Sequence, residues 1–271
     1  MKRAICLVNM LCIIIILSMG LTACGNDPYS GNFSKLATEE ELNALLEKVN
    51  AENIFSGWTG FSLKETSSTK ITYYESVTTE KTDVTAKFLF DENTLINFHD
   101  IFDGDGFLGI KAYLEIHEES RHTVDGKKNF FSKMWADEEY IYVSDNMGKR
   151  KEFWENSGAG ANINNVAYAL SLYADLYSYI ERYDISPNFF IDENGDTIKL
   201  KMKFTGSGIG WHTDWYVIFL FKNKKLAGIK MCTTAEEGIS INGRKTESVS
   251  ICEKFDGKID IPNIDDYNEN K

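Results

Sequence analysis

Three kinds of hydrophobic pattern follow one another along the chain, and the first is an uncharged, mostly apolar stretch over residues 4–21. Lys2 and Arg3 precede the stretch, and small residues lead from it to Cys24. A positive region, an apolar region and small residues in this order are typical of a secretory signal rather than of a folded element. The alternative is an uncleaved transmembrane helix, although about 18 apolar residues are the lower limit for crossing a bilayer.

The second pattern is an apolar stripe at helical spacing, which predicts a helix over residues 39–52. The stripe consists of Leu42, Leu45, Leu46 and Val49. Thr38 and Glu41 have the spacing of a capping box, in which the threonine caps the helix and the glutamate reaches back. The helix is expected to pack its stripe against a sheet. Residues 24–37 are polar and rich in small residues, and we interpret them as a flexible tether.

The third pattern is a set of short apolar runs that alternate with polar residues, which predicts strands in two groups. The first group contains Phe61/Leu63, Ile71/Tyr73, Phe88/Phe90, Tyr113/Ile116 and Ile141/Val143. The second group covers residues 189–191, 198–204, 215–221, 226–232 and 248–255. Asn, Asp and Gly residues between the runs supply turns. The sequence thus predicts a single domain over residues 38–262, followed by a polar tail over residues 263–271.

Between the two groups, residues 161–184 return to helical spacing and predict a central helix. One stripe of this helix consists of Val166, Leu170, Tyr173, Tyr177 and Ile180. Further apolar residues surround the stripe, so the helix is expected to be covered on more than one side. Two interpretations stay open. The stripe fills an ordinary aromatic core, or it lines an incompletely filled cavity between helix and sheet that holds a hydrophobic molecule.

Two cysteines on the last predicted hairpin, Cys232 and Cys252, are candidates for a disulfide. If the odd-numbered apolar residues of both strands share the buried face, paired positions add up to an even number. A turn that closes Ser240 opposite Arg244 meets this condition and places the two cysteines opposite each other. Export to an oxidising compartment would permit the bond. The alternative is two free, half-buried thiols, since a slip in register would separate them.

The net charge of the chain argues against some classes of function. The 271 residues include 29 Lys+Arg and 41 Asp+Glu, for a net charge of -12. An acidic chain argues against nucleic-acid binding, which needs a basic face. Without residues 1–23 the chain loses two basic residues and no acidic ones, so its net charge becomes -14. Next to an anionic membrane, such a protein is expected to be held by a lipid rather than by charge.

No motif for catalysis, metal binding or cofactor binding stands out in the sequence. The acidic segments 103–106 and 192–196 lack the closing glutamate of an EF-hand calcium loop, and we interpret them as turns. The four histidines lack the spacing of a metal site. The glycine-rich segment 206–210 runs into another predicted strand, whereas a phosphate-binding loop opens a helix. We therefore expect neither an enzyme nor a bound metal or cofactor.

Leu21-Thr22-Ala23-Cys24 resembles the bacterial lipobox, and the charge and the apolar run that precede it occur in the matching order. The resemblance implies cleavage between Ala23 and Cys24 and diacylation of the Cys24 thiol. The protein would then be anchored by lipid to the cell membrane and would face outside the cytoplasm. A single acyl chain holds a protein only marginally, whereas two chains give a stable anchor.

The order of the predicted elements is similar to that of the lipoprotein carriers of the LolA/LppX-like superfamily. The similarity covers residues 38–262 and ends on residues 255–262 (FDGKIDIP), which resemble the closing "G-x-I-x-I-P" of Gram-positive members. It implies an α+β fold, in which a strongly curved antiparallel sheet forms a half-barrel and the N-terminal and central helices cover its concave face. It also implies a cavity for lipids or lipidated partners, although no ligand-binding residue carries over by motif.

The sequence therefore predicts a lipid-anchored extracytoplasmic protein that binds a lipid or other hydrophobic ligand between sheet and helix. The alternative is a structural or sensing lipoprotein that has a filled core and binds another protein through its sheet edge or acidic surface. The two hypotheses differ in whether the aromatic residues leave room for a ligand.

Overall fold

The computed structural model describes residues 27–36, 38–49, 55–74, 76–90, 111–137, 139–153, 163, 188–208, 210–239 and 242–269. The chain divides into two compact units, residues 1–32 and residues 33–271. In the first unit the described residues form a turn, in which the Asp27 carboxylate accepts a hydrogen bond from the backbone N–H of Tyr29 at 3.1 Å. The helices and strands described below belong to the second unit.

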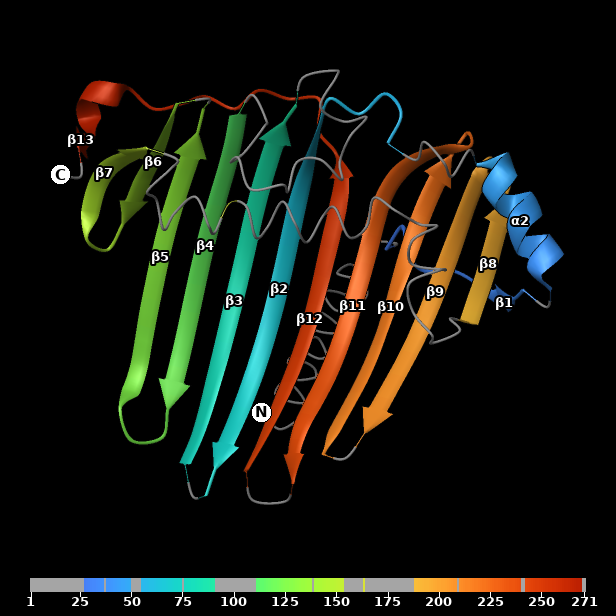
Figure 1. The fold of residues 1–271 in the computed structure, drawn as a ribbon, viewed down its shortest axis with the longest axis horizontal. Helices are drawn as coiled ribbons and strands as arrows, with labels where there is room; N and C mark the ends of the chain where they lie inside the picture. Colours follow the sequence, from blue (N-terminus) through green and yellow to red (C-terminus); the bar gives the residue numbers. More distant parts are fainter. Residues whose placement is uncertain are drawn as a thin grey trace, which may run out of the picture. The chain divides into compact units, whose positions relative to one another are not determined.

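The second unit is built on a sheet of 13 strands (Figure 1). The strands are β1 (Ser34–Lys35), β2 (Gly60–Tyr73), β3 (Ser76–Leu89), β4 (Lys111–His122), β5 (Gly126–Ala136), β6 (Tyr140–Asp145), β7 (Gly148–Phe153), β8 (Asn188–Asn194), β9 (Thr197–Gly208), β10 (Trp211–Lys222), β11 (Lys225–Ile239), β12 (Asn242–Lys254) and β13 (Asn268–Glu269). Their order across the sheet is β1-β8-β9-β10-β11-β12-β2-β3-β4-β5-β6-β7-β13.

Two antiparallel meanders make up this sheet, one from β2 to β7 and one from β8 to β12. They join where β12 pairs with β2, which places Ile251 opposite Lys64. The two-residue strands β1 and β13 lie at the outer ends of the order, and β13 is parallel to its neighbour β7. Short end strands leave little backbone for pairing with another chain.

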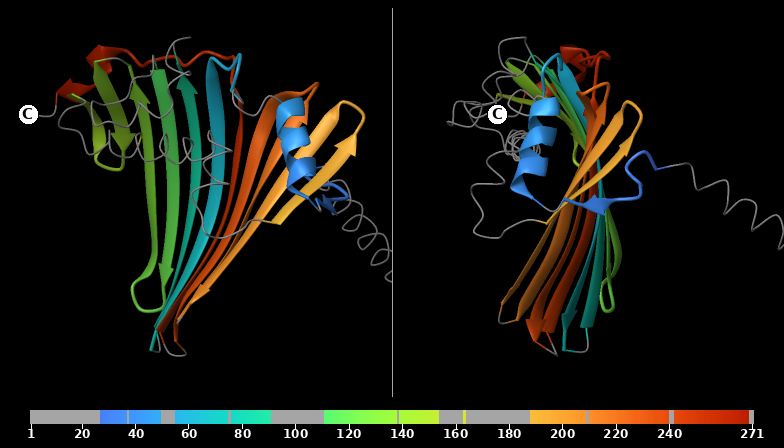
Figure 2. Two further views of the ribbon diagram at one scale, coloured as in Figure 1. Left: turned by 45° about the vertical axis from the view of Figure 1, so that its right-hand side comes forward. Right: turned by 90° about the vertical axis from the view of Figure 1, so that its right-hand side faces the viewer.

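The predicted N-terminal helix is confirmed as α2, which spans Glu39–Lys48. Its predicted capping box is also confirmed. The Glu41 N–H donates to Thr38 Oγ1 at 3.2 Å, and the Thr38 N–H donates to Glu41 Oε2 at 3.3 Å. The buried side chains are those of the predicted stripe, Leu42, Leu45, Leu46 and Val49. They belong to the same apolar cluster as the strand residues below, and Figure 2 shows α2 beside one face of the sheet.

The predicted fold class, an α+β half-barrel whose concave face is covered by two helices, is wrong. The described residues form an open, almost entirely antiparallel sheet with a single α-helix. The predicted central helix over residues 161–184 lies outside the described residues, apart from Ile163. The predicted strands were as long as their apolar runs, whereas pairing on both sides extends the long strands to between 11 and 15 residues.

Alternation along the strands gives the sheet two chemically different faces. We call the face that carries Phe61 and Phe88 the core face, and the opposite one the outer face. The buried core-face residues of the central strands include Phe61, Leu63, Ala86, Phe88, Leu114, Met134, Leu200, Met202, Val217 and Phe219. Their burial is the apolar contribution that stabilises the unit.

The strand ends furthest from α2 carry polar residues on both faces (Figure 1), for example Ser68, Thr69 and Lys70 on β2. The Thr69 hydroxyl lies 3.1 Å from that of Thr246 on the neighbouring β12. Cross-strand pairs of this kind stabilise a sheet without apolar burial. These segments are therefore part of the strands, although they lack the alternation of apolar and polar residues from which strands are predicted.

Two predicted turns are confirmed. Strands β8 and β9 meet at Asn194 and Thr197, with Gly195 between them at a φ of 60°. Strands β10 and β11 meet across Asn223 and Lys224, whose φ angles are 50° and 64°. Left-handed angles at both central residues are what a two-residue hairpin turn requires.

Part of the predicted C-terminal tail packs on the sheet. Residues Ile264–Asp266 form the 3-10 helix η5, and β13 follows it beside β7. Between the two, Tyr267 is buried with its ring centroid 5.5 Å from that of Tyr142 and 6.5 Å from that of Trp135. Aromatic contacts therefore hold this segment near the end of the sheet.

The predicted disulfide is wrong, because Cys232 and Cys252 are free and lie on opposite faces of the sheet. Paired positions of β11 and β12 add up to an odd number, so Cys232 lies opposite Val249 and Cys252 lies opposite Ile229. Cys252 is buried on the core face, and burial raises the pKa of its thiol. The register follows burial: Cys252 behaves as an apolar residue and shares the core face with Ile229.

Candidate functional site

The candidate site is a line across the core face where its apolar part meets its polar part. One residue from each strand between β5 and β9 forms this line, which we call the border row. The border row is Ser132, Ile116, Val84, Glu65, Ser250, Met231, Val217 and Met202. Next to it on the polar side lie the hydroxyl-bearing residues Thr82, Ser67, Ser248 and Thr233.

Several apolar side chains on or beside the border row are only partly buried. They are Val84, Ile116, Trp215 and Met231. Trp215 stacks on Phe204 of the neighbouring strand, with ring centroids 3.8 Å apart and planes inclined by 7°. Phe204 is fully buried, and Trp215 pairs with Thr233 one row beyond the border row. The half-exposed Trp215 ring therefore extends the apolar surface past the border row on β9 and β10.

The border row also contains polar side chains. The Ser250 hydroxyl donates to Glu65 Oε2 at 3.1 Å. Ser132 is 1% exposed, and its hydroxyl has no hydrogen-bond partner among the described residues. A buried hydroxyl without a partner costs about 1–3 kcal/mol. The border row thus combines apolar contact surface with a hydroxyl able to bond a further polar group.

The residues that the sequence predicted for the site are not tested by this geometry. The lipidation and cleavage residues, Ala23 and Cys24, and the predicted cavity lining over residues 166–180 lie outside the described residues. The border row itself was missed from the sequence. Its members come from eight strands, and only the register between strands, which no local motif reveals, brings them into one line.

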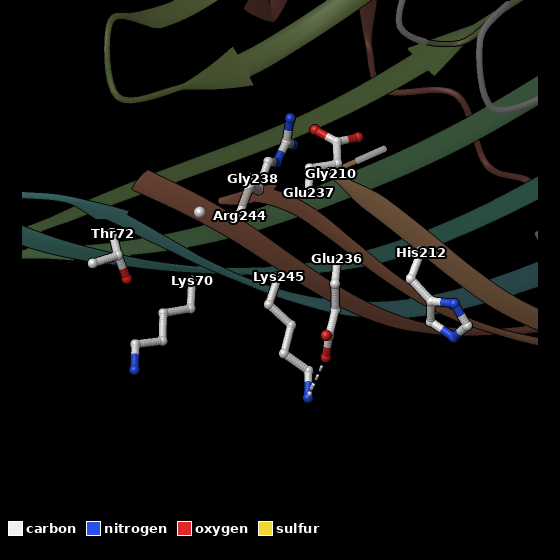
Figure 3. A pocket seen from close by; sticks show the side chains of 10 residues that line it. Lys70, Thr72, Gly210, His212, Glu236, Glu237, Gly238, Arg244 and Lys245 are labelled. Atoms are coloured by element: carbon white, nitrogen blue, oxygen red, sulfur yellow. Dashed lines mark ion pairs between the residues drawn. The ribbon is translucent and has the colours of Figure 1, made fainter. Parts of the chain in front are cut away.

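A polar groove of about 530 Å³ lies at the other end of the sheet, between β2, β10, β11 and β12 (Figure 3). Lys245 lies 3.3 Å from Glu236 and 3.0 Å from Glu247, and both carboxylates raise the pKa of its ammonium group. Figure 3 shows Lys70, Lys245, Glu236 and His212 pointing to one side, whereas Arg244 and Glu237 point to the other. Since its charges compensate one another and are exposed, the groove offers little binding energy.

Within the described ranges, no group of three or more His, Cys, Asp and Glu side chains has the arrangement of a metal site. Of the helices that the structure describes, none is long and apolar enough to cross a membrane.

Comparisons with known proteins give only distant likenesses. Neither a protein-family model nor a curated protein sequence matches the chain. A lipovitellin structure, described in terms of lipid–protein interactions, is 5% identical with a TM-score of 0.35 and matches 76% of this chain. This chain spans about a quarter of its length, 26%.

Two other solved structures are similar to the chain at lower TM-scores. The translocator domain of the autotransporter NalP from Neisseria meningitidis is 6% identical with a TM-score of 0.24, over 80% of this chain and 95% of that one. The phycobiliprotein lyase CPES from Guillardia theta is 8% identical with a TM-score of 0.16, over 82% of this chain and 100% of that one. Likenesses at this level support no conclusion about fold or ligand.

Proposed function

We propose that this chain is a membrane-anchored lipoprotein, exposed outside the cytoplasm, that binds a lipid or another amphiphile along the border row of its sheet. The observation that carries the ligand proposal is the border row itself. Half-buried apolar side chains lie there beside the Ser132 hydroxyl, which has no hydrogen-bond partner among the described residues. An amphiphile matches this arrangement, because its apolar chain would cover the apolar side chains while its polar group bonds the hydroxyls.

The anchor is proposed from the sequence around Cys24. The Leu21-Thr22-Ala23-Cys24 segment offers a thiol for diacylation directly after small residues suited to cleavage. Two acyl chains would hold the protein at the membrane stably.

Replacing Cys24 by alanine in the full chain is expected to abolish the incorporation of a labelled fatty acid during growth of a bacterial host, because no thiol remains at the predicted site. Protein fluorography or mass spectrometry of the purified chain measures the label. Cys232→Ala is the matched control, since it also removes a free thiol, and it is expected to keep full labelling. A Cys24→Ala chain that still takes up label would contradict Cys24 as the acylated residue.

The chain from Gly25 to Lys271, which keeps every described residue, is expected to carry a co-purifying lipid in native mass spectrometry. Trp215→Ala should reduce the lipid-bound fraction about tenfold, because a truncated aromatic ring removes about 1.5–3 kcal/mol of apolar contact. Tyr73→Ala is the control, since this tyrosine is 60% exposed at the last residue of β2, away from the border row. Its bound fraction should be unchanged.

Native mass spectra of a ligand-free protein would contradict ligand binding. They would favour the alternative of a protein-binding lipoprotein with a filled core. Equal losses in the Trp215 and Tyr73 variants would place the ligand away from the border row. Thermal unfolding of both variants separates loss of binding from loss of folding.

A further inference from the structure

The outer face of the sheet carries a second pattern, in which lysines alternate with apolar residues across neighbouring strands. Reading from β2 to β1, the directly paired residues are Lys64, Ile251, Lys230, Ile218, Lys201, Phe190 and Lys35. We call this line the lysine row. It contains no acidic residue, although acidic residues outnumber basic ones in the chain as a whole.

The lysine row is regular in space. Neighbouring strands lie about 4.8 Å apart, so lysines on alternate strands recur about every 10 Å across seven strands. Lys35 and Lys64 are exposed, and Lys201 and Lys230 are half-buried. The aliphatic parts of lysine side chains can lie along apolar neighbours while the ammonium groups reach the solvent. The row therefore presents several cations above an apolar base.

Aromatic rings strengthen this arrangement around Lys201. Its Nζ atom lies 4.4 Å from the ring centroid of Tyr216 and 5.4 Å from that of Phe33. All six cation–π contacts within the described ranges involve lysines of the outer face, which are Lys87, Lys133, Lys149, Lys151 and Lys201. Tyrosine rings with one polar end suit the boundary between water and lipid.

Of the carboxylates near the lysine row, Asp192 and Glu115 are paired with other groups, whereas Glu253, next to Ile251 on β12, is exposed. Asp192 Oδ2 lies 3.3 Å from Lys199 Nζ. Beyond Lys64, the same line of paired residues continues through Thr85 to Glu115. Burial alone would raise the pKa of Glu115, but hydrogen bonds from Tyr113 and His117, together with nearby Lys133, hold it below the ordinary range. Asp192 and Glu115 are thus paired locally, and Glu253 sets one negative charge against the four lysines of the row.

We propose that the lysine row binds the anionic surface of a lipid bilayer. Anionic headgroups complement its four lysines, and the apolar residues between them match the lipid side of the interface. The short link between the proposed lipid anchor at Cys24 and the lysine row favours a bilayer over other anionic partners. This argument rests on the proposed anchor. Lys35 is part of the row and follows Cys24 by 11 positions, a length of chain that reaches at most about 35–40 Å.

Vesicle co-sedimentation of the chain from Gly25 to Lys271 tests the proposal without the anchor. We expect binding to phosphatidylcholine vesicles that contain phosphatidylglycerol, weaker binding at physiological than at low ionic strength, and little binding to pure phosphatidylcholine. The triple variant Lys35→Gln/Lys64→Gln/Lys230→Gln should lower the partition coefficient about 100-fold, since each lysine near such a surface contributes about 1 kcal/mol.

The matched control is Lys48→Gln/Lys128→Gln/Lys254→Gln, which makes the same change in charge at exposed lysines on α2 and the core face. Lys48 and Lys254 make exposed ion pairs with Glu193 and Asp256, which are worth little. The control is expected to bind anionic vesicles as the parent chain does.

Equal binding to both kinds of vesicle, no binding to anionic vesicles, or an equal loss in the control would overturn the proposal. Binding to inorganic polyphosphate without binding to vesicles would also overturn it, in favour of a soluble polyanion. The outcome is distinct from that of the proposed function. The tested chain lacks Cys24, and native mass spectrometry of the lysine variants reports on the amphiphile site of the other face.

Discussion

Phe88→Ala is expected to lower the free energy of unfolding by about 3–5 kcal/mol, the range for truncating a fully buried phenylalanine. Phe88 is 0% exposed on the core face of β3. Its ring lies 4.7 Å from that of Phe61 and 6.4 Å from that of Phe90, measured between centroids. Paired strands on both sides hold the backbone in place, so the cavity left by the ring can close only in part.

Urea denaturation of the chain from Gly25 to Lys271, followed by tryptophan fluorescence, measures this loss. Phe130→Ala is the matched control, because Phe130 also lies on the core face of a strand but is 39% exposed, near the polar strand ends. We expect it to cost less than about 1 kcal/mol. Similar losses in the two variants would mean that the apolar core is not centred on the Phe61, Phe88 and Phe90 rings.

The N-terminal helix was predictable because every signal for it is local. The capping box of Thr38 and Glu41 and the leucine stripe lie within a dozen residues, and each is found as expected. The helix ends earlier than the stripe suggested, at Lys48. Hairpin turns such as Asn223-Lys224 were predictable for the same reason.

The register of the last hairpin was not predictable, because a small shift changes which residues share a face. The assumed turn at Ser240 and Arg244 gave paired positions an even sum, whereas the strands pair Ile239 with Asn242. The odd sum places Cys252 with the buried residues and leaves Val249 40% exposed. Burial of the core face decided the register, and turn chemistry alone does not contain that information.

The overall arrangement and both candidate surfaces depend on pairing between distant parts of the chain. Strands β2 and β12 are neighbours in space although Lys64 and Ile251 are far apart in the sequence. Both the border row and the lysine row cross from β2 to β12, so neither can be identified without that pairing. The net charge alone was a poor guide to membrane binding, because it averages over both faces of the sheet. Side chains alternate between the faces along each strand, and this alternation gathers lysines on one face.

The charge argument from the sequence therefore changes in one respect. A net negative chain was expected to be held at an anionic membrane by its lipid alone. If the lysine row binds a bilayer as proposed, charge takes part in orienting the domain, although not in anchoring it. A lipid anchor and a basic surface are two signals of the kind that together give stable membrane attachment.

Gly60→Ala is expected to destabilise the protein by about 1–3 kcal/mol or more, although the change adds a single methyl group. A Cβ atom at this first residue of β2 would lie 2.4 Å from the carbonyl oxygen of Phe88 and 2.9 Å from that of Phe255. Both neighbours are backbone atoms. The Phe255 N–H also donates to the Gly60 carbonyl at 3.0 Å, so the strands would have to separate and weaken this contact.

Gly243→Ala on β12 is the control for this substitution, since it also places a methyl group on a paired strand of the same sheet. The nearest atom to its Cβ would be the Glu237 carbonyl oxygen at 3.4 Å, an ordinary contact. Its effect should lie within about 0.5 kcal/mol of zero. Urea denaturation measures both variants, and equal stabilities would show that β2 and its neighbours do not approach one another as closely at Gly60 as the geometry requires.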